Sequence, residues 1–270
     1  MVELQNKYKI GVRRFGYINW IGAYSLYKKE TLRFLIVFGQ TIIGPVGTAV
    51  LFLLVISLAI GKDRADVLGV PYIEFLAPGL IAMQVIQQSF SHSSSSILMG
   101  KIMQNIVDIV GAPLSAGEVT ISIILASITR SILIAAISVI VFSFLVELAI
   151  KNYLIFFIYL VLSGFILGSA GIIAGLWADK FDHMATVTNF IIVPLSFLSG
   201  TFYSINRLPN VLQNISEINP FFYIIDGFRY GFLGASDGSI LFGIIYLSIL
   251  SCLSWLAAYI LFKKGYKIKS

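Results

Sequence analysis

Few residues in this sequence could support catalysis or metal binding. The chain of 270 residues holds two histidines, His92 and His183, and a single cysteine, Cys252. Structural zinc sites use four nitrogen or sulfur ligands, so this small supply argues against a dedicated transition-metal site. We therefore expect no metal centre in the chain.

The motifs of common enzyme classes are also absent from the sequence. A phosphate-binding loop requires G-x-x-x-x-G-K-[S/T], and Gly61-Lys62 lacks the rest of that pattern. A nucleophile elbow requires G-x-S-x-G, and Leu162-Ser163-Gly164 lacks the first glycine. No H-E-x-x-H zinc motif occurs. We predict that the chain is not an enzyme and holds no cofactor of its own.

Two polar features inside apolar runs remain. Arg130 lies about 11 residues, or roughly 16 Å, into one such run. A charge at that depth in a membrane costs at least about 2.5 kcal/mol, so Arg130 should face the protein interior and have a partner. The sequence does not identify that partner, and a structural bond and a substrate contact both stay open. His92 stands among serines, where we expect a hydrogen-bonded packing residue.

The elements that carry these residues are membrane helices. Hydrophobic residues make up 58% of the chain and charged residues 12%, whereas soluble domains average about 25% charged. A bilayer core of about 30 Å requires roughly 20 apolar residues per helix. We predict an all-α polytopic membrane protein with six transmembrane helices: Phe34–Ile60, Tyr72–Met99, Val119–Val146, Tyr153–Trp177, Val187–Tyr203 and Ile240–Phe262.

Basic residues predict the orientation of these helices. Seven of the 19 basic residues precede the first span and four follow the last, and cytoplasmic flanks carry such an excess. Both termini are therefore expected in the cytoplasm, which requires an even number of spans. The net charge of +6 then reflects topology and does not indicate nucleic-acid binding. The basic residues at the two ends are Lys7, Lys9, Arg13, Arg14, Lys28, Lys29, Arg33, Lys263, Lys264, Lys267 and Lys269.

The loop before the last span predicts two short helices. Asn219-Pro220 is typical of a helix start, and Gly234 of a helix end. The intervening 14 residues span about 20 Å, which is too short to cross a bilayer. This segment is either a re-entrant gate or an interfacial cap. Asp226 and Arg229 lie three residues apart on it and could pair.

The fifth span contains residues that disturb a helix. Pro194 and Gly200 interrupt the backbone ladder, either where a cavity is lined or where helices pack closely. Pro209 follows in the loop. Phe197 and Tyr203 lie toward the outer half of this span, where they could line a path and stack on sugar rings. Anchoring at the membrane interface would explain these aromatic residues equally well.

Several of these segments together resemble the ABC-2 type permeases, the membrane subunits of bacterial ATP-binding-cassette exporters. The resemblance rests on P-L-S-F-L-S-G-T-F-Y from Pro194, Leu208-Pro209, and N-P-F-F-Y-I-I-D-G-F-R-Y-G-F-L-G from Asn219. Y-I-E-F-L-A-P-G-L from Tyr72 and Ala112-Pro113-Leu114 add to it. It covers about residues 30 to 262.

The resemblance implies roles for two inner segments. A coupling helix that docks on the ATPase corresponds to Lys101–Val110, with apolar Ile102, Ile106, Ile109 and Val110 on one face. The alternative is a membrane-surface helix without a partner. Tyr17–Arg33 resembles the family's interfacial connecting helix. The coupling residues expected from this comparison are Lys101, Ile102, Asn105, Ile106, Asp108, Ala112 and Pro113.

The resemblance also implies the organisation and function of the chain. Residues 1–33 would form a cytoplasmic segment, 34–262 the transmembrane domain and 263–270 a basic tail. The protein would be the permease of an exporter for a hydrophobic, lipid-linked or saccharide substrate in the bacterial inner membrane. ATP and Mg²⁺ would bind a separate ATPase, and a second permease copy and lipid would be the other partners. The alternative is a secondary transporter or channel without an ATPase.

Overall fold

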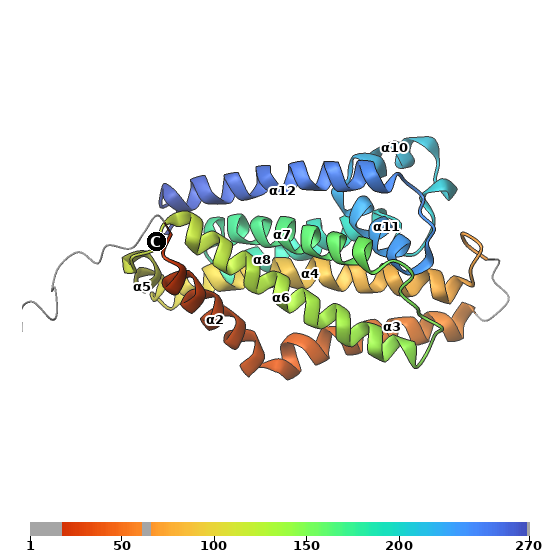
Figure 1. Cartoon of the computed structure of the whole chain (residues 1–270), viewed down its shortest axis with the longest axis horizontal. Coiled ribbons are helices and arrows are strands. Elements are labelled where there is room, and N and C mark those ends of the chain that lie inside the picture. Colours follow the sequence, from red (N-terminus) through yellow and green to blue (C-terminus); the bar gives the residue numbers. More distant parts are fainter. Residues whose placement is uncertain (1–17, 61–65, 269–270) are drawn as a thin grey trace, which may run out of the picture.

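The computed structural model describes residues 18–60 and 66–268, and its regular elements are all helices (Figure 1). The predicted all-α class is therefore confirmed. Residues 1–17 of the expected cytoplasmic segment, 61–65 of the first outer loop and 269–270 of the basic tail lie outside this description.

The long helices run along the longest axis of the molecule (Figure 1). One end of this bundle carries α5 and the C-terminal residues, and the other end carries α10 and α11. The elements in chain order are α2 (Trp20–Ile36), η1 (Gly39–Ile43), α3 (Gly44–Ile60), α4 (Tyr72–Ile102), α5 (Ile106–Gly111), α6 (Ala116–Ser143), α7 (Tyr153–Trp177), α8 (Phe181–Val187), η2 (Thr188–Ile192), α9 (Val193–Leu198), η3 (Ile205–Arg207), α10 (Asn210–Ile218), α11 (Pro220–Leu233) and α12 (Ile240–Lys263).

Five helical segments within the described residues are long and apolar enough to cross a membrane. They are Gly39–Ala59, Ala116–Ser143, Tyr153–Trp177, Phe181–Leu198 and Ile240–Lys263. The predicted bounds are wrong at three of them. The first begins at Gly39 because Phe34 belongs to α2, the predicted Val119–Val146 lies three residues earlier, and the predicted Val187–Tyr203 runs from Phe181 to Leu198. The turns that set these bounds give no strong signal in hydropathy.

Helix α4 is a sixth long helix, with a different composition. Its 31 residues reach about 46 Å, but it carries three glutamines and six serines. It contacts α3, α6, α7, α11 and η2, and most of its residues are buried. A helix that is surrounded by others needs no continuous apolar surface, which explains why α4 is less apolar than its neighbours.

Glycines on α7 allow this close packing. A Cβ added at Gly171 would lie 2.6 Å from the Phe90 carbonyl oxygen, and one at Gly175 would lie 2.7 Å from that of Ser94. The spacing of small residues at four-residue intervals lets two backbones approach closely. The serines of α4 therefore serve close helix packing at this contact.

Candidate functional site

Two of the candidate spans expose polar groups on their outer surface. Gln40 in η1 and Thr48 in α3 are exposed, as are Thr186 in α8 and Asn189 in η2. Each of the two spans contains a π-helical turn, η1 or η2, and such turns are frequent at functional sites. The Thr48 and Thr186 hydroxyls donate to the Gly44 and Asp182 carbonyl oxygens of their own helices, at 3.0 and 2.8 Å. The exposed amides of Gln40 and Asn189 are therefore the groups that lipid alone does not explain.

Helix α4 adds a polar stripe between these two spans. Met83, Gln87, Ser91, Ser95 and Met99 are all partly exposed, and they recur every four residues along one face. Both α3 and η2 pack against α4. At the far end, the Phe202 ring lies 5.3 Å from Phe52 of α3 and 5.2 Å from Phe197 of α9, joining the two spans.

The exposed face of α12 provides a contrast. Its exposed residues, apart from the terminal Lys263, are Leu241, Phe242, Ile245, Ile249, Cys252, Leu253, Leu256, Ala257 and Ile260. These exposed residues carry no amide or hydroxyl, and the half-exposed residues of α12 add hydroxyls but no amide: Tyr246, Ser248, Ser254 and Tyr259. We use the name polar strip for seven of the exposed and half-exposed polar residues of the other three segments: Gln40, Thr48, Gln87, Ser91, Ser95, Thr186 and Asn189.

Sequence reasoning missed most of the polar strip. An amide within an apolar run, such as Gln40 or Asn189, was a usable signal. The expected path residue Phe197 is exposed on α9, at the same side as Phe202. The Tyr203 hydroxyl donates to the carbonyl oxygens of Phe197 and Leu198, at 3.2 and 3.1 Å. The Tyr203 hydroxyl therefore caps the C-terminal end of α9.

Arg130 faces the bundle interior, as its depth predicted. It donates hydrogen bonds to the Gln88 side chain and, at 3.1 Å, to the Thr41 carbonyl oxygen. The guanidinium therefore links α6 to α4 and to η1. This geometry corresponds to the structural interhelical bond that the sequence left open. Arg130 is buried and is no part of the polar strip.

A second polar network joins α2 to α4. The Arg33 side chain donates to Glu30 at 2.9 Å and to the His92 carbonyl oxygen at 3.0 Å. Buried Glu30 also accepts from Ser96 at 2.8 Å. The predicted side-chain hydrogen bond of His92 is wrong, because neither ring nitrogen has a partner among the described residues and the ring packs edge-on against Phe34.

The loop between α9 and α12 forms the two predicted short helices, α10 and α11. The Asn219 side chain accepts from the Phe221 N–H and donates to the Ser199 hydroxyl at 2.8 Å, which ties α11 to the end of α9. Pro209 precedes α10, Pro220 opens α11, and Gly234 ends it with φ +71°. Local capping signals therefore predicted the boundaries of α11 correctly.

The predicted pair of Asp226 and Arg229 is replaced by other contacts. Asp226 accepts from the backbone N–H groups of Asp237 and Gly238, at 2.8 and 2.9 Å. Arg229 lies 3.6 Å from the Asp237 carboxylate and donates to the Gly200 carbonyl oxygen at 2.7 Å. These contacts fix α11 to the loop that follows it, at Asp237 and Gly238, and to Gly200 after α9.

Arg229 also connects α11 to α4. Its guanidinium stands 3.8 Å from the centre of the Phe75 ring, which is a cation–π contact. Gly200 has φ +82°, a conformation that favours glycine, and its carbonyl oxygen accepts from Arg229. Pro194 lies at the start of α9, directly after the π-helical turn. The Pro194–Gly200 segment thus shapes the contact between α9 and α11.

The inner segment is not the continuous amphipathic helix expected between Lys101 and Val110. Helix α4 ends at Ile102, Gln104 takes φ +58°, and α5 begins at Ile106. The four residues of the expected apolar face are divided, because Ile106 and Ile109 are buried within the chain, whereas Ile102 and Val110 are exposed together with Met103 and Val107. Asn105, Asp108 and Pro113 are exposed and Ala112 is half-buried.

Lys101 is buried instead of lying on a polar face. Only 8% of its surface is exposed, and its amine donates to the Leu176 and Ala178 carbonyl oxygens at 2.8 and 2.6 Å. These are orphan acceptors at the end of α7, where a cation is favourable. Asp179 lies 3.5 Å away, and a hydrogen bond from Lys267 holds the pKa of Asp179 below its ordinary value.

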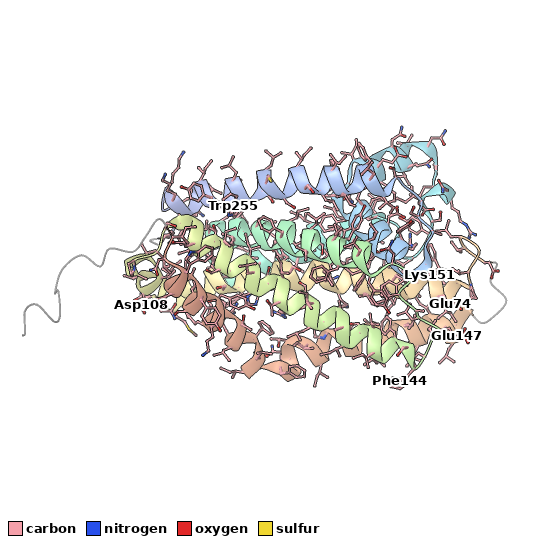
Figure 2. The ribbon with its side chains drawn as sticks, viewed as in Figure 1. Glu74, Asp108, Phe144, Glu147, Lys151 and Trp255 are labelled. Atoms are coloured by element: carbon pink, nitrogen blue, oxygen red, sulfur yellow. The ribbon has the colours of Figure 1, made fainter. Side chains whose placement is uncertain are left out.

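A groove separates α2 from the α5 segment at this end. Its volume is about 480 Å³, and Gly22, Leu26, Asp108, Ile109 and Pro113 are among the residues that line it. Figure 2 places Asp108 at this end of the molecule, and Glu74, Glu147 and Lys151 at the opposite end. Among the residues that the structure describes, no group of three or more His, Cys, Asp or Glu side chains could hold a metal ion.

Comparison with known proteins gives consistent matches. A model of the family described as ABC-2 type transporter matches residues 23–233. The inner membrane transport permease YadH of Escherichia coli K12 is 30% identical over 256 residues, which is 94% of this chain and 99% of YadH. Nodulation protein J of Sinorhizobium fredii is 21% identical over 82% of this chain and 84% of its own length.

Proposed function

This chain belongs to the ABC-2 type transporter family, and from that premise we propose that it is the membrane-spanning subunit of an ATP-driven exporter. The observation that carries the proposal is the polar strip. Polar groups facing lipid find no hydrogen-bond partners, so such groups in membrane segments face protein or water. The amides of Gln40, Gln87 and Asn189 in the strip meet this description, whereas the exposed and half-exposed residues of α12 include no amide.

A second copy of the chain would complete the path. Two copies that face each other through their polar strips would enclose a route lined by amides and hydroxyls. Phe197 would stand at the outer part of this route, because it lies on α9 beyond Asn189. The homodimer and the route are parts of the proposal and are tested below.

The inner tip of the protein supports docking of an ATPase. Ile102, Met103, Val107 and Val110 expose apolar side chains around Asp108 and Asn105. This end also carries Lys263, Lys264 and Lys267, and cytoplasmic ends are rich in such residues. Exposed apolar groups in a water-facing location are typical of a protein interface. We place the ATPase, with its ATP and Mg²⁺, against this tip and the neighbouring groove.

The contacts of α4 provide a route from the inner to the outer end. Glu30 and Arg33 bind α2 to the inner half of α4. At the outer end, Phe75 of α4 lies beneath Arg229 of α11. A shift of α2 on ATP binding would therefore reach α11 through one continuous helix. Asn219–Gly234 would then act as the outer gate.

In this proposal α4 is the sixth span and α11 is re-entrant. Helix α4 is long enough to cross, and helices on several sides cover its polar groups. Helix α11 has 14 residues, about 20 Å, and is largely buried, so it is too short to cross and too covered for a surface cap. Both termini then lie in the cytoplasm.

The descriptions of the two relatives inform the proposed membrane location and the proposed substrate of this chain. One is described as an inner membrane transport permease and the other as a nodulation protein. We infer the same multi-pass location in the bacterial inner membrane for this chain. A hydrophobic, lipid-linked or saccharide substrate is consistent with a strip that mixes amides, hydroxyls and nearby aromatic rings.

The ATPase partnership is tested by co-purification. The tagged permease should bring down a protein with a phosphate-binding loop, and Asp108→Arg should abolish this by placing a cation in the apolar docking surface. Glu217→Arg is the matched control, because Glu217 is an exposed acid near the opposite end. Absence of any ATPase from the wild-type preparation would refute the proposal and favour a transporter that works without one.

The path is tested by cross-linking between copies. In a Cys252→Ser background, Asn189→Cys should form cross-linked dimers with a short bismaleimide, because both copies present this face to each other. Ile249→Cys, on the apolar face of α12, should stay monomeric in the same assay. Equal cross-linking at both positions would exclude the polar strip as the dimer face.

A further inference from the structure

Helix α10 exposes an apolar side at the end of the bundle that carries α11. Val211, Ile215 and Ile218 on this helix are 72%, 48% and 75% exposed. They recur at intervals of four and three residues, so their side chains lie along one side of the helix. Adjacent exposed aliphatic side chains of this kind are typical of a surface that has a partner.

A polar side runs along α10 next to the apolar one. Asn210, Asn214 and Glu217 are exposed, and each stands one residue before a member of the apolar side. Consecutive residues of a helix are about 100° apart around its axis, so the two exposed sides are about 100° apart. The exposed surface of α10 is therefore divided lengthwise into an apolar and a polar half.

Hydrogen bonds fix the remaining side of α10 against the protein. The buried Ser216 hydroxyl donates to the Leu198 carbonyl oxygen of α9 at 3.2 Å, and the Gln213 side chain donates to Asn206 at 3.3 Å. These bonds set the rotation of α10 about its own axis. The apolar side is therefore held outward by the fold.

The apolar side of α10 continues the exposed apolar surface of α12. The Tyr246 hydroxyl donates to the Ile218 carbonyl oxygen at 2.7 Å, and Figure 1 shows α10 beside the end of α12 where that helix begins. Tyr246 lies about 9 Å along α12 from its first residue, so α10 reaches the level of the outer turns of α12. These turns expose Leu241, Phe242 and Ile245, by 70%, 54% and 51%.

A bilayer surface fits both sides of α10 at once. Helix α12 is a candidate span without any polar-strip residue, so the side chains that it exposes meet lipid, and the same lipid reaches α10. An amphipathic helix at a bilayer surface places its apolar side among the acyl chains and its polar side in water. The one charged residue of α10 is Glu217, on the polar side, so no charge has to enter the lipid.

We propose that α10 binds the surface of the outer leaflet, with Val211, Ile215 and Ile218 inserted among the lipids and Asn214 and Glu217 in water. Asn219 alone separates α10 from α11, so this contact places the start of the proposed outer gate at the membrane surface. The insertion depends on neither the cargo nor the ATPase. Its assignment to the outer leaflet rests on the proposed topology.

Spin labels on adjacent residues test the insertion. In a Cys252→Ser background, Ile215→Cys and Asn214→Cys place a nitroxide on the apolar and polar sides of the full chain, in nanodiscs of phosphatidylglycerol. Dissolved oxygen reports exposure to lipid, and a water-soluble nickel chelate reports exposure to water. The ratio of oxygen to nickel accessibility should be several-fold higher at Ile215→Cys than at Asn214→Cys. It should match the ratio at Leu253→Cys, a 58% exposed position on α12.

Two results of this measurement would overturn the insertion. Equal ratios at Ile215→Cys and Asn214→Cys would place the whole helix in water. Low accessibility to both reagents at Ile215→Cys and at Val211→Cys would show that protein, such as a second copy of the chain, covers the apolar side. Val211→Cys is the second variant because its residue is 72% exposed, so the substitution leaves the packing of the helix intact.

Labelling of intact cells tests the leaflet separately. A membrane-impermeant maleimide should modify Asn214→Cys from outside the inner membrane. Modification only after lysis would overturn the outer leaflet and the proposed topology together, and it would leave the accessibility ratio unchanged. Failure of the insertion and failure of the proposed topology are therefore distinguishable.

Discussion

Substitution of Gly171 by alanine should weaken the contact between α4 and α7 that forms the centre of the bundle. The new Cβ would lie 2.6 Å from the Phe90 carbonyl oxygen, 3.0 Å from the Ser93 Cβ and 3.1 Å from the Ser94 backbone nitrogen. Two of these three atoms are backbone, so the helices must separate to admit the methyl group. Overpacking of this kind costs about 1–3 kcal/mol.

The matched control is Gly117→Ala in the first turn of α6. Its Cβ would lie 3.7 Å from the nearest atom, on the Tyr259 ring, which is an ordinary van der Waals distance. Alanine is favoured over glycine in a helix by up to about 1 kcal/mol, so this variant should be neutral or slightly more stable. Both variants replace glycine with alanine, but the steric clash is introduced by Gly171→Ala and not by Gly117→Ala.

Thermal unfolding of the purified protein measures the difference. A cost of 1–3 kcal/mol should lower the Tm of Gly171→Ala by about 2–12 °C, since each kcal/mol shifts the Tm by about 2–4 °C in large domains. The transport rate should fall as well, because α4 would no longer move as one unit with α7. If Gly171→Ala unfolds at the wild-type temperature, or if Gly117→Ala is equally destabilised, close packing of α4 on α7 is refuted.

Three further predictions follow from individual contacts. Arg229→Gln should destabilise the protein by about 3–5 kcal/mol, because it leaves Asp237 without its buried cation, while exposed Arg207→Gln should be neutral in the same unfolding assay. Lys101→Met keeps the aliphatic stem but loses both bonds to the end of α7, so chemical denaturation should show a loss of about 1.5–3 kcal/mol, and an unchanged midpoint would contradict this capping role. The pKa of Asp179 is lowered in the folded state. Its contribution to the free energy of unfolding is therefore present above the pKa of the unfolded state, and it is lost as the pH falls through the pKa of the folded state. The stability difference between wild type and Asp179→Asn should therefore shrink in acid, and a difference that is constant with pH would rule out the bond from Lys267 as its source.

Much of the fold follows from local patterns that sequence reading can detect. The five apolar candidate spans overlap the predicted runs, because a helix in lipid must satisfy its backbone internally and be apolar over its length. The two short outer helices were also predicted, because Asn219-Pro220 and Gly234 act through their own backbone neighbours. Such signals depend on residues only a few positions apart.

The partners of the buried charges could not be predicted in this way. Arg229 has an acid three residues away in sequence, yet its carboxylate partner is Asp237, which the loop after α11 brings back to it. Lys101 looks like a surface residue in the sequence and is buried because the end of α7 offers it two carbonyl oxygens. Arg130 finds Gln88 and Thr41 on two other helices.

The sequence by itself determined that the chain is a bundle of membrane helices, which parts of the chain form them, and which motifs link it to its family. Only the tertiary structure decided which polar side chains are covered and which are exposed. Gln84 and Gln87 lie three residues apart in the same helix, but one is buried and the other is half-exposed in the polar strip. The physical reason is that exposure depends on which helices pack against each face, and those helices lie far away along the chain.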